Sequence, residues 1–114
     1  LFNAAVAMTG GQKVIGQRTV PAITIDKLAD EFGVPDLIKC DVEGHEVRVI
    51  LGAGLTLETR PDLFIEVHNA QLGASLMEIL RPLYGDELQV LRHPFYRPEQ
   101  WGWANHFWLY RHAT

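Results

Sequence analysis

The stretch that decides the fold runs from Asp36 to Gly54 and reads DLIKCDVEGHEVRVILGAG. Its first seven residues form a nearly continuous apolar run, which is typical of a buried strand. Asp41 and Glu43 stand at the end of this run, and Gly44 then permits a tight turn into a helix. An apolar strand gains no stability by ending in clustered carboxylates, because like charges repel and their burial costs desolvation. We therefore predict that this strand end is a catalytic or ligand-binding edge.

Composition limits the class of protein. The chain has 114 residues, of which 47% are hydrophobic and 21% charged, as in one small globular domain. A net charge of -4 disfavours binding to nucleic acid or to an anionic membrane, since phosphate contacts need a basic face. No apolar run approaches the ~20 residues of a membrane span. Cys40 has no partner for an internal disulfide, so we expect a core position for it and a cytoplasmic protein.

Strand-like and helix-like segments alternate along the chain. Glu46 stands in the first turn of the helix that follows Gly44, where a carboxylate favours the helix dipole. Nearly continuous apolar strands favour an α/β fold with a mostly parallel sheet and helices on both faces. The last strand follows a loop rather than a helix, so we expect it to be antiparallel. The expected strands cover residues 1–6, 13–23, 36–42, 61–68, 87–93 and 106–112, and the expected helices cover 24–33, 44–54 and 75–85.

A second pair of polar side chains follows the next apolar run. Glu66 and His68 end the expected strand over residues 61–68. Sequential parallel strands are usually neighbours, and ligands bind outside the carboxyl ends of such strands. We therefore expect both residues to lie beside Asp41 and Glu43 at one edge of the sheet. An imidazole is the side chain best suited to move protons near neutral pH, which makes His68 the candidate general base.

The residues themselves leave more than one function open. Hard cations prefer oxygen ligands, so a divalent metal held by Asp41, Glu43 and Glu66 is an alternative, although the sequence assigns no metal ligand. The same cluster would suit a metal-dependent phosphoester hydrolase. Against it, Lys39 is the sole basic residue of the motif region that could meet a phosphate. A third interpretation is a non-catalytic interaction module that uses the aromatic loop over residues 94–105.

Three segments resemble one known family in order and spacing. The stretch from Asp36 to Ala53 is similar to the signature of the FkbM-type methyltransferases, in which a strand reading Ile-Lys-x-Asp-x-Glu-Gly leads into a helix. Upstream, TVPAITIDKLADEFGVPDLIK resembles the segment that precedes this strand in the family. Downstream, RPDLFIEVHN resembles the family's next strand, which typically ends in Glu and often His. Together the three segments cover about half of the chain.

The resemblance implies S-adenosylmethionine-dependent methyl transfer on a Rossmann-like sheet. The expected acceptor is a hydroxylated small molecule, such as a sugar or another natural product. By this resemblance Asp41 would contact the cofactor or an acceptor hydroxyl, and Glu43 and Glu66 would orient the acceptor. His68 would be the base in an in-line displacement.

The resemblance also implies that residues 1–114 are part of a methyltransferase domain. In such proteins a glycine-rich loop after the first strand cradles the methionine part of the cofactor, and neither Gly10-Gly11 nor Gly52-x-Gly54 follows a buried strand and opens a helix. We therefore expect the chain to be the C-terminal, acceptor-side half of the domain, without the N-terminal cofactor-binding half. We expect such a fragment to be inactive alone.

Overall fold

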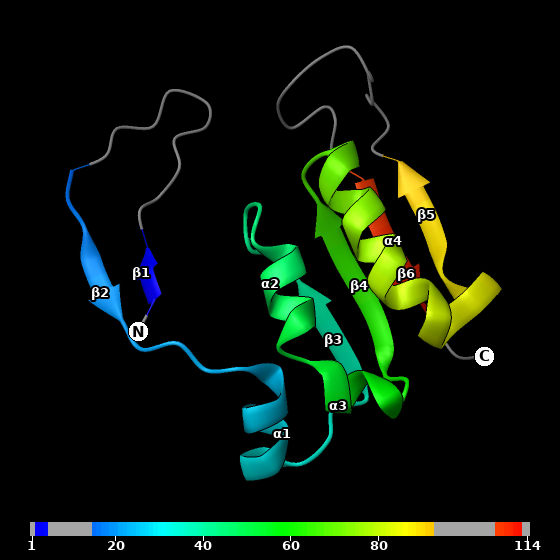
Figure 1. The fold of residues 1–114 in the computed structure, drawn as a ribbon, viewed down its shortest axis with the longest axis horizontal. Coiled ribbons are helices and arrows are strands. Elements are labelled where there is room, and N and C mark those ends of the chain that lie inside the picture. Colours follow the sequence, from blue (N-terminus) through cyan, green and yellow to red (C-terminus); the bar gives the residue numbers. More distant parts are fainter. Residues whose placement is uncertain (1, 5–14, 93–106, 113–114) are drawn as a thin grey trace.

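The computed structural model describes residues 2–4, 15–92 and 107–112. The aromatic loop over residues 94–105 lies outside the described residues. Along the chain the elements are β1 (Phe2–Ala4), β2 (Arg18–Val20), α1 (Ile25–Phe32), β3 (Leu37–Cys40), α2 (Glu46–Leu51), α3 (Gly54–Glu58), β4 (Asp62–Val67), α4 (Ala70–Tyr84), the 3-10 helix η1 (Gly85–Glu87), β5 (Gln89–Arg92) and β6 (Phe107–Arg111) (Figure 1).

Two separate sheets are formed by the described strands. β1 and β2 make an antiparallel pair, and β2 ends before Pro21, which lacks a backbone donor. The larger sheet has the order β3-β4-β6-β5. β3 and β4 are parallel, and β6 is antiparallel to both of its neighbours. The prediction of an antiparallel last strand is therefore confirmed. β3, β4 and β5 run in one direction, although only the β3–β4 pair is bonded in parallel.

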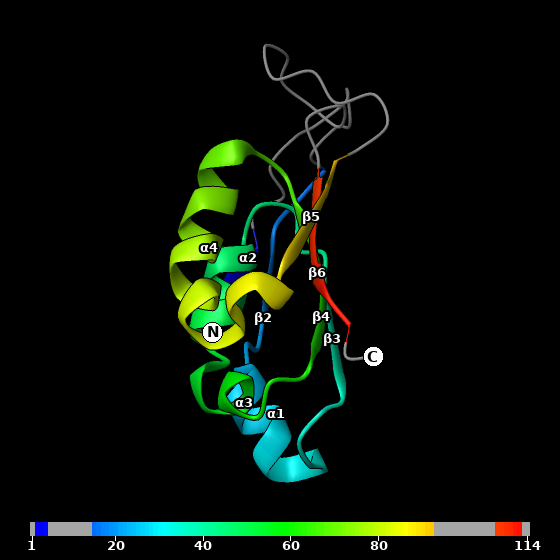
Figure 2. The ribbon, with the colours of Figure 1, turned by 90° about the vertical axis from the view of Figure 1, so that its right-hand side faces the viewer.

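The helices α2, α3 and α4 lie on one face of the larger sheet (Figure 2). The prediction of helices on both faces is therefore wrong for the described residues. Each connection from β3 to β4 and from β4 to β5 advances the same way across the sheet, and right-handed crossovers then place their helices on the same side. Phe64 and Trp108 stack on the other face, with ring centroids 6.3 Å apart.

The core lies between the helices and the helix-facing side of the sheet. Alternate residues of each strand supply it, as the two-residue period of a strand requires. At about 25 cal/mol per Å², fully burying each large aliphatic side chain contributes roughly 2 kcal/mol. The buried aliphatic side chains of the sheet are Ile38, Leu63, Ile65, Val67 and Leu109, and those of the helices are Ile50, Leu57, Leu76 and Leu80.

Helix boundaries differ from the sequence-based expectation at two places. The helix α2 lies within the range expected over residues 44–54, and α3, which starts at Gly54, is an additional short helix that the sequence pattern does not predict. The helix expected to start at residue 75 starts at Ala70 instead. Asn69 explains the earlier start, since its side chain accepts the Leu72 N–H at 2.9 Å as an N-cap.

A carboxylate of α1 holds the start of α3. Thr24 caps α1 by accepting the Lys27 N–H at 3.1 Å, so Asp26 is free to act elsewhere. Asp26 accepts the N–H groups of Leu55 and Thr56 at 3.0 and 2.8 Å, and the Thr56 hydroxyl at 2.7 Å. These donors lower the pKa of Asp26, with the Thr56 backbone N–H as the largest cause. The contact joins the segments before and after β3.

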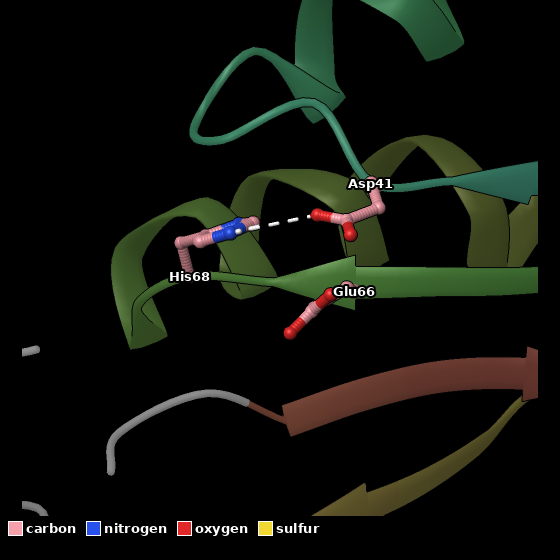
Figure 3. A group of neighbouring side chains, drawn as sticks. All are labelled: Asp41, Glu66 and His68. Atoms are coloured by element: carbon pink, nitrogen blue, oxygen red, sulfur yellow. Dashed lines mark ion pairs between the residues drawn. The ribbon is translucent and has the colours of Figure 1, made fainter. Parts of the chain in front are cut away.

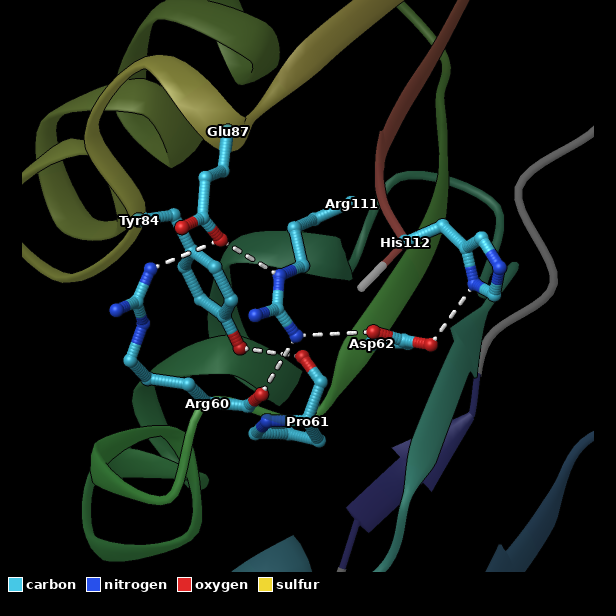
Figure 4. A network of polar contacts seen from close by, with 7 residues as sticks. All are labelled: Arg60, Pro61, Asp62, Tyr84, Glu87, Arg111 and His112. Atoms are coloured by element: carbon cyan, nitrogen blue, oxygen red, sulfur yellow. Dashed lines mark hydrogen bonds and ion pairs between the residues drawn. The ribbon is translucent and has the colours of Figure 1, made fainter. Parts of the chain in front are cut away.

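A polar network fastens the amino end of β4 to the carboxyl end of β6 (Figure 4). Arg111 bonds Glu87, Asp62 and the Arg60 carbonyl, each at 2.9 Å. The Tyr84 hydroxyl donates to the Pro61 carbonyl at 2.7 Å beneath the guanidinium groups of both arginines. Burial is the main reason why the pKa of Tyr84 rises to about 12. The residues of this network are Arg60, Pro61, Asp62, Tyr84, Glu87, Arg111 and His112.

We expect Asp26→Asn to lower stability in a pH-dependent way. The folded-state pKa of Asp26 is below its ordinary value of 3.8, so its carboxylate stabilises the fold fully above that pH. This contribution is lost as pH falls through 3.8 towards the folded-state value. Urea unfolding of both proteins should show the full deficit of the variant at pH 6 and a smaller one near pH 3. A constant deficit at both pH values would contradict the role given to the charge.

We expect Tyr84→Phe to destabilise the protein by roughly 1–2 kcal/mol, because the buried Pro61 carbonyl loses its donor. Chemical denaturation monitored by circular dichroism measures the change. Tyr110→Phe is the matched control, since the Tyr110 hydroxyl bonds Gln89 at an exposed position. Equal effects of the two substitutions would show that burial of the bond is unimportant.

Candidate functional site

The chain turns sharply between β3 and α2. Glu43 has φ 52° and Gly44 has φ 101°, so two successive residues adopt left-handed conformations. The prediction that Gly44 permits a tight turn is confirmed. Glu43 has a side chain, and a left-handed conformation costs a residue of this kind roughly 1 kcal/mol. The backbone at this position is therefore strained, and the Glu43 carboxylate lies close to His68 at the end of β4.

Two of the carboxylates expected at the strand ends lie beside the imidazole ring of His68. His68 directly follows the last residue of β4, and Asp41 directly follows the last residue of β3. The Nε2 atom of His68 lies 3.3 Å from Glu43 Oε2. The same atom lies 3.7 Å from Asp41 Oδ1 (Figure 3). The imidazole is 12% exposed, whereas the Glu43 side chain is 72% exposed. The parallel pairing of β3 and β4 produces this meeting, as expected from the sequence.

A third carboxylate lies on the other side of the same ring. Glu46, the first residue of α2, is completely buried. Its Oε1 atom lies 2.6 Å from His68 Nδ1 and accepts the Gly44 N–H at 3.1 Å. Its Oε2 atom is buried and has no hydrogen-bond partner among the described residues. Sequence reasoning assigned Glu46 only to the helix dipole. The missed signal is its spacing of four residues from Ile50, which places it on the buried face of the helix.

Glu66 lies at the rim of this cluster. Figure 3 shows its side chain turned away from the Asp41–His68 pair, on the side of β4 that faces β6. One oxygen of Glu66, one of Asp41 and one nitrogen of His68 nevertheless lie within 4.8 Å of one another. These three residues could hold a divalent cation, although acidic groups commonly cluster at exposed positions without one.

The electrostatic potential at this edge is negative. Cys40, the last residue of β3, is buried in the core as expected. Its pKa rises to about 11, mainly through burial and further through the charges of Glu46 and Asp41. A thiol of this kind is a poor nucleophile, so the position of Cys40 gives it no catalytic role. The same potential favours a positively charged ligand.

A cavity of about 440 Å³ adjoins the turn. Val42 and His45, which flank Glu43 and Gly44 in the sequence, line it, whereas the carboxylates of the cluster are not among its lining residues. The remaining walls come from the segment before α1 and from α2, and most of them are apolar. The other lining residues are Ala22, Ile23, Thr24, Ile25, Arg48, Val49 and Gly52.

The comparisons with known proteins identify the family. Residues 3–106 match the model of the methyltransferase FkbM domain, so the chain belongs to the FkbM methyltransferase family. The chain is also similar to the hexuronic acid methyltransferase AglP of Haloferax volcanii, with 34% identity over 67 residues. That match covers 55% of this chain and 28% of AglP, so the chain spans little more than a quarter of its relative. No solved structure matches.

The described residues contain no helix with the length and apolar character that a membrane crossing requires. The aromatic side chains that an interaction module would use lie outside the described residues. They are Phe95, Tyr96, Trp101 and Trp103.

We expect Glu43→Gly to be more stable than Glu43→Ala by roughly 1 kcal/mol, because glycine adopts φ 52° without a steric cost. Both variants lose the carboxylate beside His68, so the difference between them isolates the backbone strain. Chemical denaturation at neutral pH provides the measurement. If alanine proves as stable as glycine, the left-handed conformation carries no strain at this position.

Proposed function

We propose that the complete protein transfers a methyl group from S-adenosylmethionine to a hydroxyl oxygen of a sugar or another small molecule. The observation that carries the proposal is the meeting of Asp41, Glu43 and His68 at the carboxyl ends of two parallel strands, in a chain of the FkbM methyltransferase family. Catalytic groups in open α/β sheets gather at this edge. Family membership favours methyl transfer over the phosphoester hydrolase and over a non-catalytic module.

The negative charge of the residues at this edge suits a positively charged sulfonium cofactor. S-Adenosylmethionine carries a positive sulfur, and the cluster offers several carboxylates but no basic side chain other than an imidazole. Asp41, whose side chain is partly exposed, is the residue we assign to the cofactor. The mainly apolar cavity beside Val42 and His45 is large enough to take a nucleoside or an acceptor ring. Bound S-adenosylmethionine supplies an electrophilic methyl group.

The side chains of the cluster then act on the acceptor. The acceptor hydroxyl loses its proton to Nε2 of His68 as its oxygen forms the new bond to the methyl carbon and the bond from that carbon to sulfur breaks. The electron pair of the broken bond stays on sulfur. Asp41 and Glu43 face Nε2 and stabilise the imidazolium that forms. Glu43 is exposed to solvent, which gives the proton an exit. Glu66 orients the acceptor from the rim.

We further propose that the sheet is the C-terminal half of a Rossmann-like sheet, and that the preceding part of the protein supplies the cofactor-binding half. β3 ends the sheet of the described residues, and apolar side chains are exposed beside it, with Phe32 81% and Leu37 59% exposed. An uncovered apolar edge of this kind is a pairing surface for further strands. The greater length of AglP agrees with this proposal. Residues 1–114 alone would then be inactive, and the complete protein would work in the cytoplasm.

We expect Asp41→Ala and Glu66→Ala, each in the full-length protein, to reduce methyl transfer by about 10²-fold while the fold is retained. Removal of one of several crowded carboxylates relieves repulsion, so stability should not fall. The measurement is transfer of labelled methyl from S-adenosylmethionine to hydroxylated acceptors, beside circular dichroism. Glu58→Ala, an exposed carboxylate at the end of α3, is the control.

Near-normal turnover in both variants would refute the site. A full-length protein that binds no S-adenosylmethionine would refute the methyltransferase proposal itself. Dialysis against EDTA provides a further check, because a base and a metal ligand are exclusive roles for Nε2 of His68. Turnover that disappears with EDTA and returns with Mg²⁺ would make His68 a ligand together with Asp41 and Glu66.

A further inference from the structure

The cavity of about 440 Å³ beside the turn differs in charge from the carboxylate cluster. Among the described residues, its lining contains two side chains that can carry a positive charge, Arg48 and His45, and no carboxylate. The side chains around His68, by contrast, are carboxylates. The turn between β3 and α2 therefore has a negative region on one side and a basic region on the other.

Arg48 and His45 border this cavity from α2 and from its N-cap. They are three residues apart, and side chains with this spacing are neighbours on a helix surface. His45 is the N-cap residue, but its side chain does not form the hydrogen bond that caps a helix. A guanidinium presents a fork of N–H donors, and an imidazole presents at least one more. Such a pair suits the oxygens of a carboxylate or phosphate.

The rest of the wall suits the body of a ligand with a ring. Ala22, Ile23 and Ile25 line the cavity from the start of α1 and the segment before it, and Val49 lines it from α2. In ligand sites of this kind, apolar side chains contact most of the ligand, and a few polar groups fix its orientation. A ring that carries one anionic group would find contacts for both of its parts.

The charges also distinguish the acceptor from the cofactor. S-Adenosylmethionine carries a sulfonium and an ammonium group beside its carboxylate, so its net charge is positive. A basic cavity disfavours such a cation, whereas the carboxylates beside His68 favour it. We propose that the acceptor carries a carboxylate or phosphate group, which Arg48 and His45 bind in this cavity. This inference rests on the proposed methyl transfer and names the chemical class of its acceptor.

A purely structural role for Arg48 makes a different prediction. Arg48 lies in the last turn of α2, where a positive charge favours the helix dipole. Arg81 lies in the last turn of α4 and does not line this cavity, so Arg81→Gln is the matched control. If Arg48 serves only its own helix, Arg48→Gln and Arg81→Gln should both lower stability slightly, and neither should change the binding of a ligand.

The test is calorimetric binding of three probes to the full-length protein: glucose, glucuronate and glucose 6-phosphate. The probes share one ring and differ in charge. We expect an anionic probe to bind about 10-fold or more tightly than glucose, because it gains a charge-assisted contact. Arg48→Gln should remove this preference, and Arg81→Gln should retain it. Equal binding of all three probes to the wild type, or an unchanged preference in Arg48→Gln, would overturn the proposal.

A second substitution keeps the test valid if circular dichroism shows that Arg48→Gln does not fold. Ile23 lines the cavity and is 52% exposed, so Ile23→Asp adds a negative charge to the wall without burying it. Ile23→Asn is the neutral match. We expect Ile23→Asp to weaken binding of the anionic probe relative to glucose, and Ile23→Asn to leave the ratio unchanged. The same ratio in both variants would contradict an anion site in this cavity.

Binding of S-adenosylmethionine to the same variants separates the two possible sources of the anionic group. If Arg48→Gln weakens binding of the cofactor and leaves binding of the sugar probes unchanged, the basic pair binds the methionine carboxylate, and the proposal is overturned. These measurements need no turnover, so they also separate this inference from the proposed function. Anionic probes that bind through Arg48 in a protein that transfers no methyl group would support the anion site and refute the methyltransferase proposal.

Discussion

The parallel pairing of β3 with β4 is the constraint on which the rest of the structure depends. Its register joins Leu37 to Asp62 and Cys40 to Ile65, so β4 continues two residues beyond the partner of the last residue of β3. The helix-facing side chains of β4 are almost completely buried, which prevents the strand from slipping by one residue without exposing all of them. The polar residues after each strand therefore meet because the apolar residues within each strand are fixed.

The carboxylates that gather around His68 have an electrostatic cost, because they repel one another and one of them is buried. Glu46 is removed from water completely, and the nearby negative charges raise the pKa of Cys40 beyond the effect of burial. Glu43 adds backbone strain to this cost. Neither feature helps the chain to fold, and both converge on His68. Local costs of this kind, concentrated on one side chain, are the physical reason for regarding the edge as a functional site.

Much of this arrangement follows from short-range patterns in the sequence. The apolar runs predict β3 and β4, and the rule for parallel strands predicts that Asp41 and His68 meet. Other features depend on contacts that periodicity does not encode. Asn69 starts α4 through its side chain, and Asp26 holds the start of α3, a helix that the sequence pattern does not predict. The helices share one face because the strand order advances in one direction, and strand order is a property of the whole sheet.

Glu46 illustrates the same limit within the site. Its position in the sequence fits an ordinary first-turn charge, and only the packing of α2 against the sheet decides that it is buried beside His68.

The tie between Asp26 and Thr56 has a consequence for motion at the opposite end of the sheet. It closes the chain from α1 to α3 into a loop that contains β3, the strained turn and α2. Figure 1 places α1 and α3 beside the start of β3, away from its carboxyl end. Segments closed in this way tend to open as one cooperative unit. Amide hydrogens on both sides of the turn should then exchange together. The time for which Asp41, Glu43 and His68 stay together would depend on the bonds between Asp26 and Thr56, at the other end of β3.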